Sequence, residues 1–229
     1  MGCMLAQLFG PPQEWPDQDL IGFTEEFDAL LTVGAYLSGV FPMPLLDMVD
    51  YDQTMGWWSP MQRGILPPEQ LKVSRSLAKS VDRYHTTVDQ AFGRVLRGCA
   101  DPRREGGWIE QRIMTVYTQL HEQGLVHSVE TWDAEGRLVG GLYGVSLGAM
   151  FAGESMFHDP VHGRDASKVA LVRLAEELIS QDVELLDVQW VTDHLRSLGA
   201  FEVSRMAYLE QLSDALDARP TDWAAISAE

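Results

Sequence analysis

The chain has 229 residues, a formal net charge of −17 and 45% hydrophobic residues. This combination is typical of a globular protein with a filled core and excludes a disordered or fibrous chain. No apolar run approaches the roughly eighteen residues that cross a bilayer, and no Lys or Arg precedes Arg63, so we expect neither a membrane span nor a basic targeting signal. With only Cys3 and Cys99 available, a reducing cytoplasm is the expected location.

The charges are unevenly distributed along the chain. Residues 1–70 hold one basic and ten acidic residues, whereas residues 71–112 hold nine basic and five acidic ones. The overall acidity argues against a nucleic-acid partner, because phosphates are normally neutralised by a basic surface. The basic segment is the exception, and four of its cations have the spacing of one helix face: Lys72, Arg75, Lys79 and Arg83. A solvated helix face and a phosphate-binding face both fit this pattern.

Two regions are expected. Residues 1–70 are acidic and rich in proline, which predicts a small, irregular lobe with one helical pattern near residues 24–37. Residues 71–229 predict the main domain. Its expected elements are one or two amphipathic helices at 71–98, a helix at 110–123, strands at 127–132, 138–145 and 149–153, a helix at 165–181, a strand at 184–189, a helix at 192–198, a strand at 201–204 and a helix at 206–218. This order predicts an α/β (α+β) fold in which helices sandwich a mixed sheet.

Glycine is concentrated in the first three of these strands. A hairpin is expected around the turn at residues 133–136, where Gly136 suits the turn geometry. Five further glycines follow at 140, 141, 144, 148 and 153. Each forfeits side-chain packing and costs backbone entropy, so we expect another part of the molecule or a ligand to lie close against this sheet.

A polar pair, Asp187 and Gln189, ends the strand expected at 184–189. Residues i and i+2 of a strand face the same side, so the two side chains should project together while Val188 faces the other way. Burying a carboxylate and a carboxamide without partners costs several kcal/mol. The pair is therefore either satisfied by neighbouring backbone or used in a reaction.

Six motifs occur in order in the second half of the chain: HSVExW at His127, LVGGLYGV at Leu138, FxGESMF at Phe151, ASKxAL at Ala166, LLDVQ at Leu185 and HLxSLGA at His194. With WWSP at Trp57 and GGWI at Gly107, they resemble the bacterial leucyl/phenylalanyl-tRNA-protein transferases over roughly Trp57–Leu212. The resemblance implies an N-acetyltransferase-like fold. It also implies an enzyme that moves leucine or phenylalanine, with methionine as a further donor, from aminoacyl-tRNA to proteins with N-terminal Arg or Lys, marking them for degradation.

The resemblance also implies roles for individual residues. Asp187 and Gln189 would form the catalytic pair, and Glu154 would bind the incoming α-amino group or the cationic first side chain. Trp108 and one of Trp57 and Trp58 would hold the terminal adenosine, since aromatic rings stack on unpaired bases. The donor side chain would lie among Leu142, Met156, Leu171, Leu174 and Leu186, which as isolated observations are ordinary core residues. The basic residues between 72 and 83 would contact tRNA phosphates.

Several other features bear on function. The histidines have no metal-ligand spacing, and no metal or cofactor is expected. A monomer is expected. Residues 31–43 depart from the GGDL and GIFPW segments of the family, which indicates a shortened or diverged N-terminal lobe.

Two readings from other classes compete with the transferase. An acetyl-coenzyme-A-dependent acyltransferase would need a glycine-rich pyrophosphate loop, but residues 157–168 contain one glycine. A non-catalytic adaptor for protein N-termini would leave Asp187 and Gln189 without a purpose.

Overall fold

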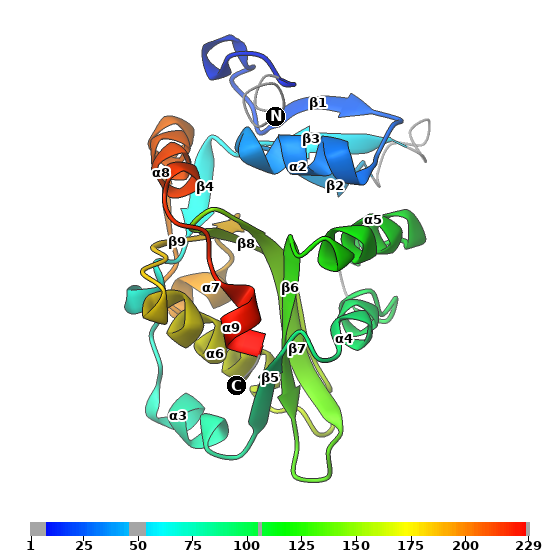
Figure 1. Cartoon of the computed structure of the whole chain (residues 1–229), viewed down its shortest axis with the longest axis vertical. Helices are drawn as coiled ribbons and strands as arrows, with labels where there is room; N and C mark the ends of the chain where they lie inside the picture. Colours follow the sequence, from blue (N-terminus) through cyan, green and yellow to red (C-terminus); the bar gives the residue numbers. More distant parts are fainter. Residues whose placement is uncertain (1–7, 46–53, 105–106, 228–229) are drawn as a thin grey trace.

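The computed structural model of the chain describes residues 8–45, 54–104 and 107–227. A small lobe lies above a larger domain in Figure 1. The elements of the small lobe are η1 (Pro12–Glu14), β1 (Leu20–Thr24), α2 (Ala29–Leu37), β2 (Phe41–Pro44) and β3 (Met55–Trp58). Those of the main domain are β4 (Gln62–Ile65), η2 (Pro68–Gln70), α3 (Arg75–Val81), β5 (His85–Val88), α4 (Phe92–Cys99), α5 (Gln111–Glu122), β6 (Val126–Trp132), β7 (Leu138–Leu147), β8 (Met150–His158), α6 (Ala166–Ser180), β9 (Leu185–Gln189), α7 (Asp193–Ser197), β10 (Phe201–Ser204), α8 (Arg205–Asp217) and α9 (Trp223–Ser227).

The small lobe is a three-stranded antiparallel sheet, in the order β1-β3-β2, with helix α2. The Asp28 carboxylate caps α2 by accepting a hydrogen bond from the Leu31 N–H at 2.8 Å. Strand β2 contains Pro42 and Pro44, which a sheet tolerates because β2 is an edge strand. The expected small lobe is present, but it is more regular than expected, because two of the prolines that indicated turns, Pro42 and Pro44, lie within a strand.

The main sheet has seven strands in the order β10-β4-β9-β8-β7-β6-β5. Strands β8 and β9 run parallel, and every other neighbouring pair is antiparallel. The hairpin β6-β7 forms as expected: the Asp133 carboxylate accepts the backbone N–H groups of Glu135 and Arg137, and Gly136 has a φ of 73°. An α+β fold built on a mixed sheet is confirmed.

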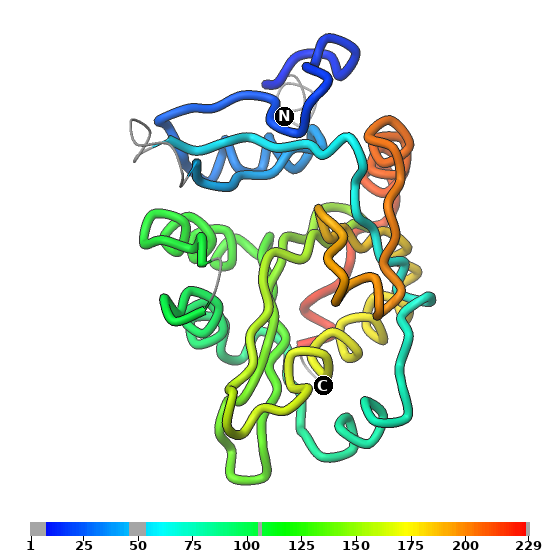
Figure 2. Tube along the Cα trace, turned by 180° about the vertical axis from the view of Figure 1, so that it is seen from behind, coloured from blue at the N-terminus to red at the C-terminus, as the bar shows by residue number. Residues whose placement is uncertain are grey.

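Helices cover both faces of this sheet. Helices α4 and α5 lie on one side of the strands and α6 on the other, as Figures 1 and 2 show from opposite directions. The glycines of β7 allow these helices to pack closely on the sheet. A Cβ on Gly140 would lie 2.5 Å from the Cβ of Ala166 in α6, which is too close for a side chain to fit. The expected close neighbour of the glycine-rich sheet is thus, at this position, a helix of the same chain.

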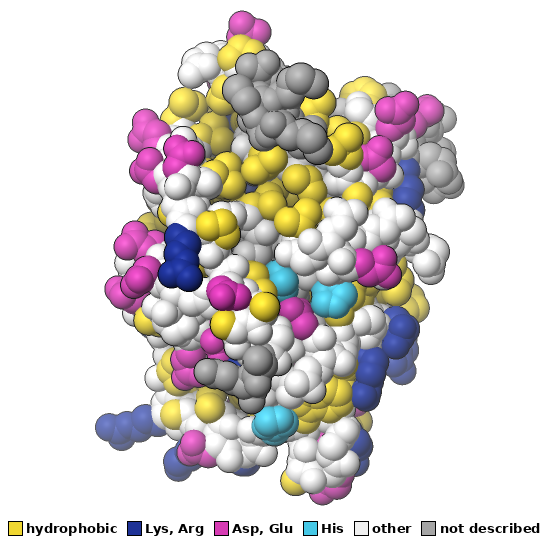
Figure 3. Space-filling model, in the orientation of Figure 1, with side chains coloured by type: hydrophobic (Ala, Val, Ile, Leu, Met, Phe, Trp, Pro, Cys, Tyr) yellow, Lys and Arg dark blue, Asp and Glu magenta, His cyan; other side chains and the backbone are white. Residues whose placement is uncertain are grey.

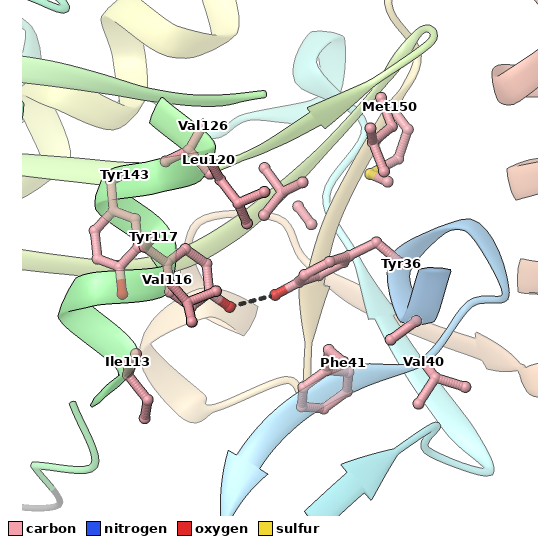
Figure 4. Close-up of a cluster of buried hydrophobic side chains, with 14 of the residues drawn as sticks. Tyr36, Val40, Phe41, Ile113, Val116, Tyr117, Leu120, Val126, Tyr143 and Met150 are labelled. Atoms are coloured by element: carbon pink, nitrogen blue, oxygen red, sulfur yellow. Dashed lines mark hydrogen bonds between the residues drawn. The ribbon is translucent and has the colours of Figure 1, made fainter. Parts of the chain in front are cut away.

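A buried cluster joins the two lobes. Val40 and Phe41 of the small lobe belong to the same buried cluster as Ile113 and Val116 of α5, and the Tyr36 hydroxyl is 2.7 Å from that of Tyr117 (Figure 4). These contacts place α2 beside α5. The small lobe therefore forms one wall of the space above the main sheet.

The region from 71 to 98 differs from the expectation of one or two helices. Helices α3 and α4 are present, but strand β5 lies between them and pairs with β6 along the edge of the main sheet. Strand β4, at 62–65, likewise belongs to the main sheet, so the two sheets separate between Trp58 and Gln62 and not near residue 70. No helix in the described residues is long and apolar enough to cross a membrane.

Candidate active site

One cavity, of about 390 Å³, opens between β2 of the small lobe and strands β7, β8 and β9 with helix α6 of the main domain. Its apolar wall contains all five residues expected to hold the donor side chain, Leu142, Met156, Leu171, Leu174 and Leu186. Trp108, Glu154 and Gln189 line the same cavity. The structure thus brings together eight of the sequence-predicted residues from five segments of the chain.

Asp187 lies beneath the cavity in a buried ion pair and does not line it. Its two oxygens accept the Arg63 Nε–H at 2.9 Å and an Arg63 terminal N–H at 2.6 Å, and both side chains are at most 1% exposed. The Tyr208 hydroxyl donates to the same carboxylate at 3.0 Å. Burial alone would lower the pKa of Arg63, but the Asp187 carboxylate outweighs it and keeps the guanidinium charged.

Arg63 was not predicted as part of the site. Its guanidinium lies between the rings of Phe41 and Tyr208, 4.8 Å and 4.3 Å from their centroids, and donates to the Gly39 carbonyl at 3.1 Å. The ion pair therefore ties strand β4, the end of α2 and strand β9 together. The available signal was that Arg63 is the only basic residue among the first seventy.

Gln189 is positioned by a hydrogen bond of its backbone N–H. Its N–H donates to the Asp187 carboxylate at 2.9 Å, and its φ of 57° is left-handed. This conformation breaks the strand alternation, so Gln189 lines the cavity together with Leu186 and Val188 while Asp187 points away from it. The expectation that Asp187 and Gln189 project to the same side is wrong for this reason. The Gln189 side-chain nitrogen is buried without a hydrogen-bond partner among the described residues.

Glu154 is the second polar group of the cavity. One of its oxygens accepts the Tyr117 hydroxyl at 2.9 Å, and Tyr117 is in turn bonded to Tyr36 (Figure 4). Its other oxygen is buried without a partner among the described residues, as is the hydroxyl of Tyr143 beside it in the cavity wall. Burial raises the pKa of Glu154 to about 7, although the tyrosine hydrogen bonds act in the opposite direction.

The tryptophans divide into two groups. Trp108 lines the cavity, as does Trp190, which directly follows the DVQ motif and was not predicted. Trp57 is 1% exposed and donates its indole N–H to Thr24 at 2.9 Å, so burial excludes it as a stacking platform. Trp58 does not line the cavity: its N–H donates to the Met43 carbonyl, and its ring packs edge-on against Trp190 at 5.8 Å.

The basic residues near 72–83 do not share one helix. Helix α3 carries Arg75 and Lys79, whereas Lys72 precedes it and Arg83 follows it; all four are exposed. The apolar face of α3 packs on α6 through Leu77. No group of three potential metal ligands occurs among the residues that the structure describes.

The cavity joins an apolar wall, a carboxylate, a carboxamide and aromatic rings, which together can bind an aminoacyl group and an amine. The family model described as "Leucyl/phenylalanyl-tRNA protein transferase" matches residues 65–213. Curated relatives with the name leucyl/phenylalanyl-tRNA--protein transferase include those of Afipia carboxidovorans, 52% identical over 85% of this chain and 84% of that protein, and Rhodopseudomonas palustris, 50% identical over 82% and 85%. That of an Anaeromyxobacter species is 45% identical over 90% and 88%. The chain therefore belongs to the leucyl/phenylalanyl-tRNA protein transferase family and is an aminoacyltransferase.

Proposed function

We propose that this protein transfers leucine or phenylalanine, with methionine as a further donor, from aminoacyl-tRNA to the α-amino group of proteins that begin with Arg or Lys. Such a product would be marked for degradation. The observation that carries the proposal is that the apolar wall, Glu154 and Gln189 meet in one cavity. We further propose that the protein acts as a monomer in the cytoplasm, where charged tRNA is available.

The donor would enter with its side chain against the apolar wall and its ester carbonyl near Gln189. The terminal adenine would stack on Trp108 and Trp190, since these indole rings line the cavity and those of Trp57 and Trp58 do not. The exposed cations Lys72, Arg75, Lys79 and Arg83 would contact tRNA phosphates.

The reaction is an aminolysis. The neutral α-amino nitrogen of the acceptor attacks the ester carbonyl carbon, a peptide bond forms, and the carbon–oxygen bond to the ribose breaks. The proton lost by nitrogen leaves with the ribose hydroxyl or with solvent. Because the ester is already activated, most of the catalysis required is orientation. The Gln189 carboxamide would orient the amine by hydrogen bonding.

Asp187 would act by positioning. Both of its oxygens already accept hydrogen bonds from Arg63, Tyr208 and the Gln189 backbone, so its carboxylate does not reach the amine. It holds Gln189 in the left-handed conformation that turns the side chain toward the cavity. The buried Glu154 oxygen, which lacks a partner among the described residues, would receive the cationic side chain of the acceptor.

A direct assay tests the proposal. Purified protein, leucyl-tRNA and a peptide that starts with Arg are mixed, and the peptide mass is measured. We expect a gain of one leucine residue, and no gain when the peptide N-terminus is acetylated. Transfer to the blocked peptide, or acylation by acetyl-coenzyme A in place of leucyl-tRNA, would contradict it. Binding of the peptide without transfer would indicate an adaptor.

The shape of the apolar wall predicts the choice of donor. A misplaced methyl group costs about 1–3 kcal/mol, so transfer of leucine should exceed that of isoleucine or valine by roughly ten- to two-hundredfold in kcat/KM. Met156→Ala, which enlarges the cavity, should reduce the advantage of leucine over bulkier donors. The measurement is transfer from matched charged tRNAs. Equal transfer of the three aliphatic residues would show that these side chains do not select the donor.

The aromatic platform predicts a contrast between two neighbouring tryptophans. Stacking of one base contributes about 1–3 kcal/mol, so Trp190→Ala should weaken binding of an amide-linked leucyl-adenosine analogue by at least about fivefold. Trp190→Phe should retain most of the affinity. Trp58→Phe is the matched control, because Trp58 supports Trp190 without lining the cavity, and it should bind normally. Titration by calorimetry measures all three, and unchanged binding by Trp190→Ala would remove Trp190 from the site.

A further inference from the structure

A second hollow adjoins the active-site cavity. It has a volume of about 810 Å³ and shares Arg104, Met156 and His194 with the first cavity, so the two adjoin. Its walls come from the segment after α4, which contains Arg104, the end of β8, the loop before α6, the first turn of α6 and α7. None of its residues was assigned a role by the sequence motifs except Met156.

The wall of this hollow is basic although the protein is acidic. Its charged and titratable residues are Arg104, His158, Arg164, Lys168, His194 and one acid, Asp165. The Asp165 carboxylate is already engaged, by Lys168 at 2.9 Å and by the Ser80 hydroxyl at 3.2 Å, and it lies 3.9 Å from the Arg164 guanidinium. The Arg104 guanidinium donates to the carbonyls of Cys99 and Met156 and has no carboxylate partner in the described part of the chain. A chain with a net charge of −17 thus concentrates cations beside its reaction centre.

The electrostatics of His194 reflect its burial and the other basic groups of this wall. Burial is the main cause that lowers the pKa of His194, and Lys168 and His158 lower it further. All three side chains line the hollow. An anion bound in this hollow would offset the charge of Lys168 and favour the protonated form of His194.

We propose that this basic hollow binds the phosphodiester backbone immediately before the terminal adenosine of the donor tRNA. The inference rests on the proposed function and specifies where its donor leaves the cavity. An aminoacyl-adenosine in the first cavity must carry its 5′-phosphate to a rim, and the rim at Arg104 leads to Arg164 and Lys168. The acceptor does not suit the hollow, because its N-terminal Arg or Lys would be repelled there.

The hollow also continues toward the exposed cations of α3. Ser80, in the last turn of α3, bonds to Asp165 at the start of α6, and the Tyr84 hydroxyl bonds to the Arg164 carbonyl at 2.9 Å. Arg75 and Lys79 therefore lie on the element next to the hollow. A single-stranded 3′ end bound in the hollow would therefore pass close to these cations with its phosphates.

The test compares donor analogues that differ by phosphate. The probes are 3′-deoxy-3′-(leucylamino)adenosine, its 5′-phosphate, and the same nucleoside extended by one cytidylyl residue; the amide prevents transfer. We expect the wild type to bind the phosphorylated probes about tenfold more tightly than the nucleoside. This gain should shrink to about twofold or less in Arg104→Gln and in Arg164→Gln, and it should fall with added salt.

Arg103→Gln is the matched control. Arg103 is adjacent to Arg104 in the chain, but it is 88% exposed and bonds to Asp101 outside the hollow. The Arg103→Gln variant loses the same charge as Arg104→Gln, yet it should keep the full gain in affinity from the phosphate. The Arg164→Gln variant guards against misfolding, since Arg164 is 83% exposed. Equal affinity of the wild type for the three probes would overturn the inference while leaving the proposed function intact. Failure of the unphosphorylated nucleoside to bind would instead count against the proposed function.

Discussion

Replacing Arg63 alone is expected to lower the free energy of unfolding more than almost any other single substitution. Arg63→Met would leave the Asp187 carboxylate buried without its counter-ion, and Asp187→Leu would do the same to the guanidinium. Each should lower the free energy of unfolding by about 3–5 kcal/mol, whereas the double variant should recover most of the loss, because an apolar pair can replace a buried ion pair. Denaturant unfolding at pH 7 measures the cycle.

The double variant should recover stability but not turnover. The double variant lacks the carboxylate that holds the Gln189 N–H. Its kcat should therefore be at least about tenfold below that of the wild type, like that of Gln189→Ala, which corresponds to about 1.4 kcal/mol of transition-state stabilisation. Binding of the donor analogue should change little, since the apolar wall and the tryptophans remain.

Arg205 provides the control for this cycle. It is also a buried arginine, but it donates to backbone carbonyls, including that of Ser59 at 2.9 Å, and not to Asp187. Arg205→Met should also destabilise the protein, and adding Asp187→Leu should lower its free energy of unfolding further. Wild-type kcat in a folded Arg63→Met/Asp187→Leu variant would contradict the positioning role of Asp187.

The second large effect concerns Glu154 and pH. Its pKa of about 7 means that the carboxylate is neutral below this pH and charged above it. Preference for a peptide with N-terminal Arg over the same peptide with citrulline, which is neutral, should therefore rise as the pH increases from 6 to 8. Taking the ratio of the two kcat/KM values cancels the titration of the α-amino group. In Glu154→Gln the ratio should stay low at every pH.

Two tyrosines give the controls for this experiment. The Tyr117 hydroxyl donates to Glu154 and lowers its pKa, so in Tyr117→Phe the midpoint of the preference should shift to higher pH. The Tyr143 hydroxyl has no hydrogen-bond partner among the described residues, and Tyr143→Phe should leave the midpoint in place. A preference for Arg that persists unchanged in Glu154→Gln would assign acceptor recognition elsewhere.

Glu154→Gln should also report on the cost of burying this carboxylate. Because its folded pKa is raised, the group favours folding while protonated, and its contribution is lost as the pH rises from the ordinary glutamate range through about 7. The variant should therefore be more stable than the wild type at pH 8 and similar to it at pH 5. A Glu154→Gln variant that is at least as stable as the wild type would also show that its loss of acceptor preference does not arise from misfolding.

Sequence reasoning succeeded where local signals determine the structure. The hairpin β6-β7, strand β10 and the helices α6, α7 and α8 were predicted within a few residues, because turn residues and helix periodicity mark them. Strand β5 was missed because its four residues are too few to show alternation between two helices. The small sheet was missed because prolines on an edge strand resemble turns.

The site could be predicted only in part for a similar reason. Motifs identified Glu154 and Gln189, and the resemblance grouped the apolar wall. Arg63 and Trp190 act through contacts that no local pattern encodes: the Arg63 to Asp187 pair spans 124 positions, and Trp190 reaches the cavity because Gln189 turns the strand. The same left-handed residue invalidated the simple alternation rule for the catalytic pair.

The position of β4 in the main sheet has a consequence for folding. Strand β4 is early in the chain, yet it lies between β9 and β10, so residues 62–65 cannot pair until residues 185–204 have been synthesised. Such long-range pairing slows folding because the chain must close a large loop first. The ion pair beneath Gln189 forms across this same junction. The hairpin β6-β7 and α6 can therefore form early on the ribosome, whereas the reaction centre assembles among the last steps, after nearly the whole chain has emerged.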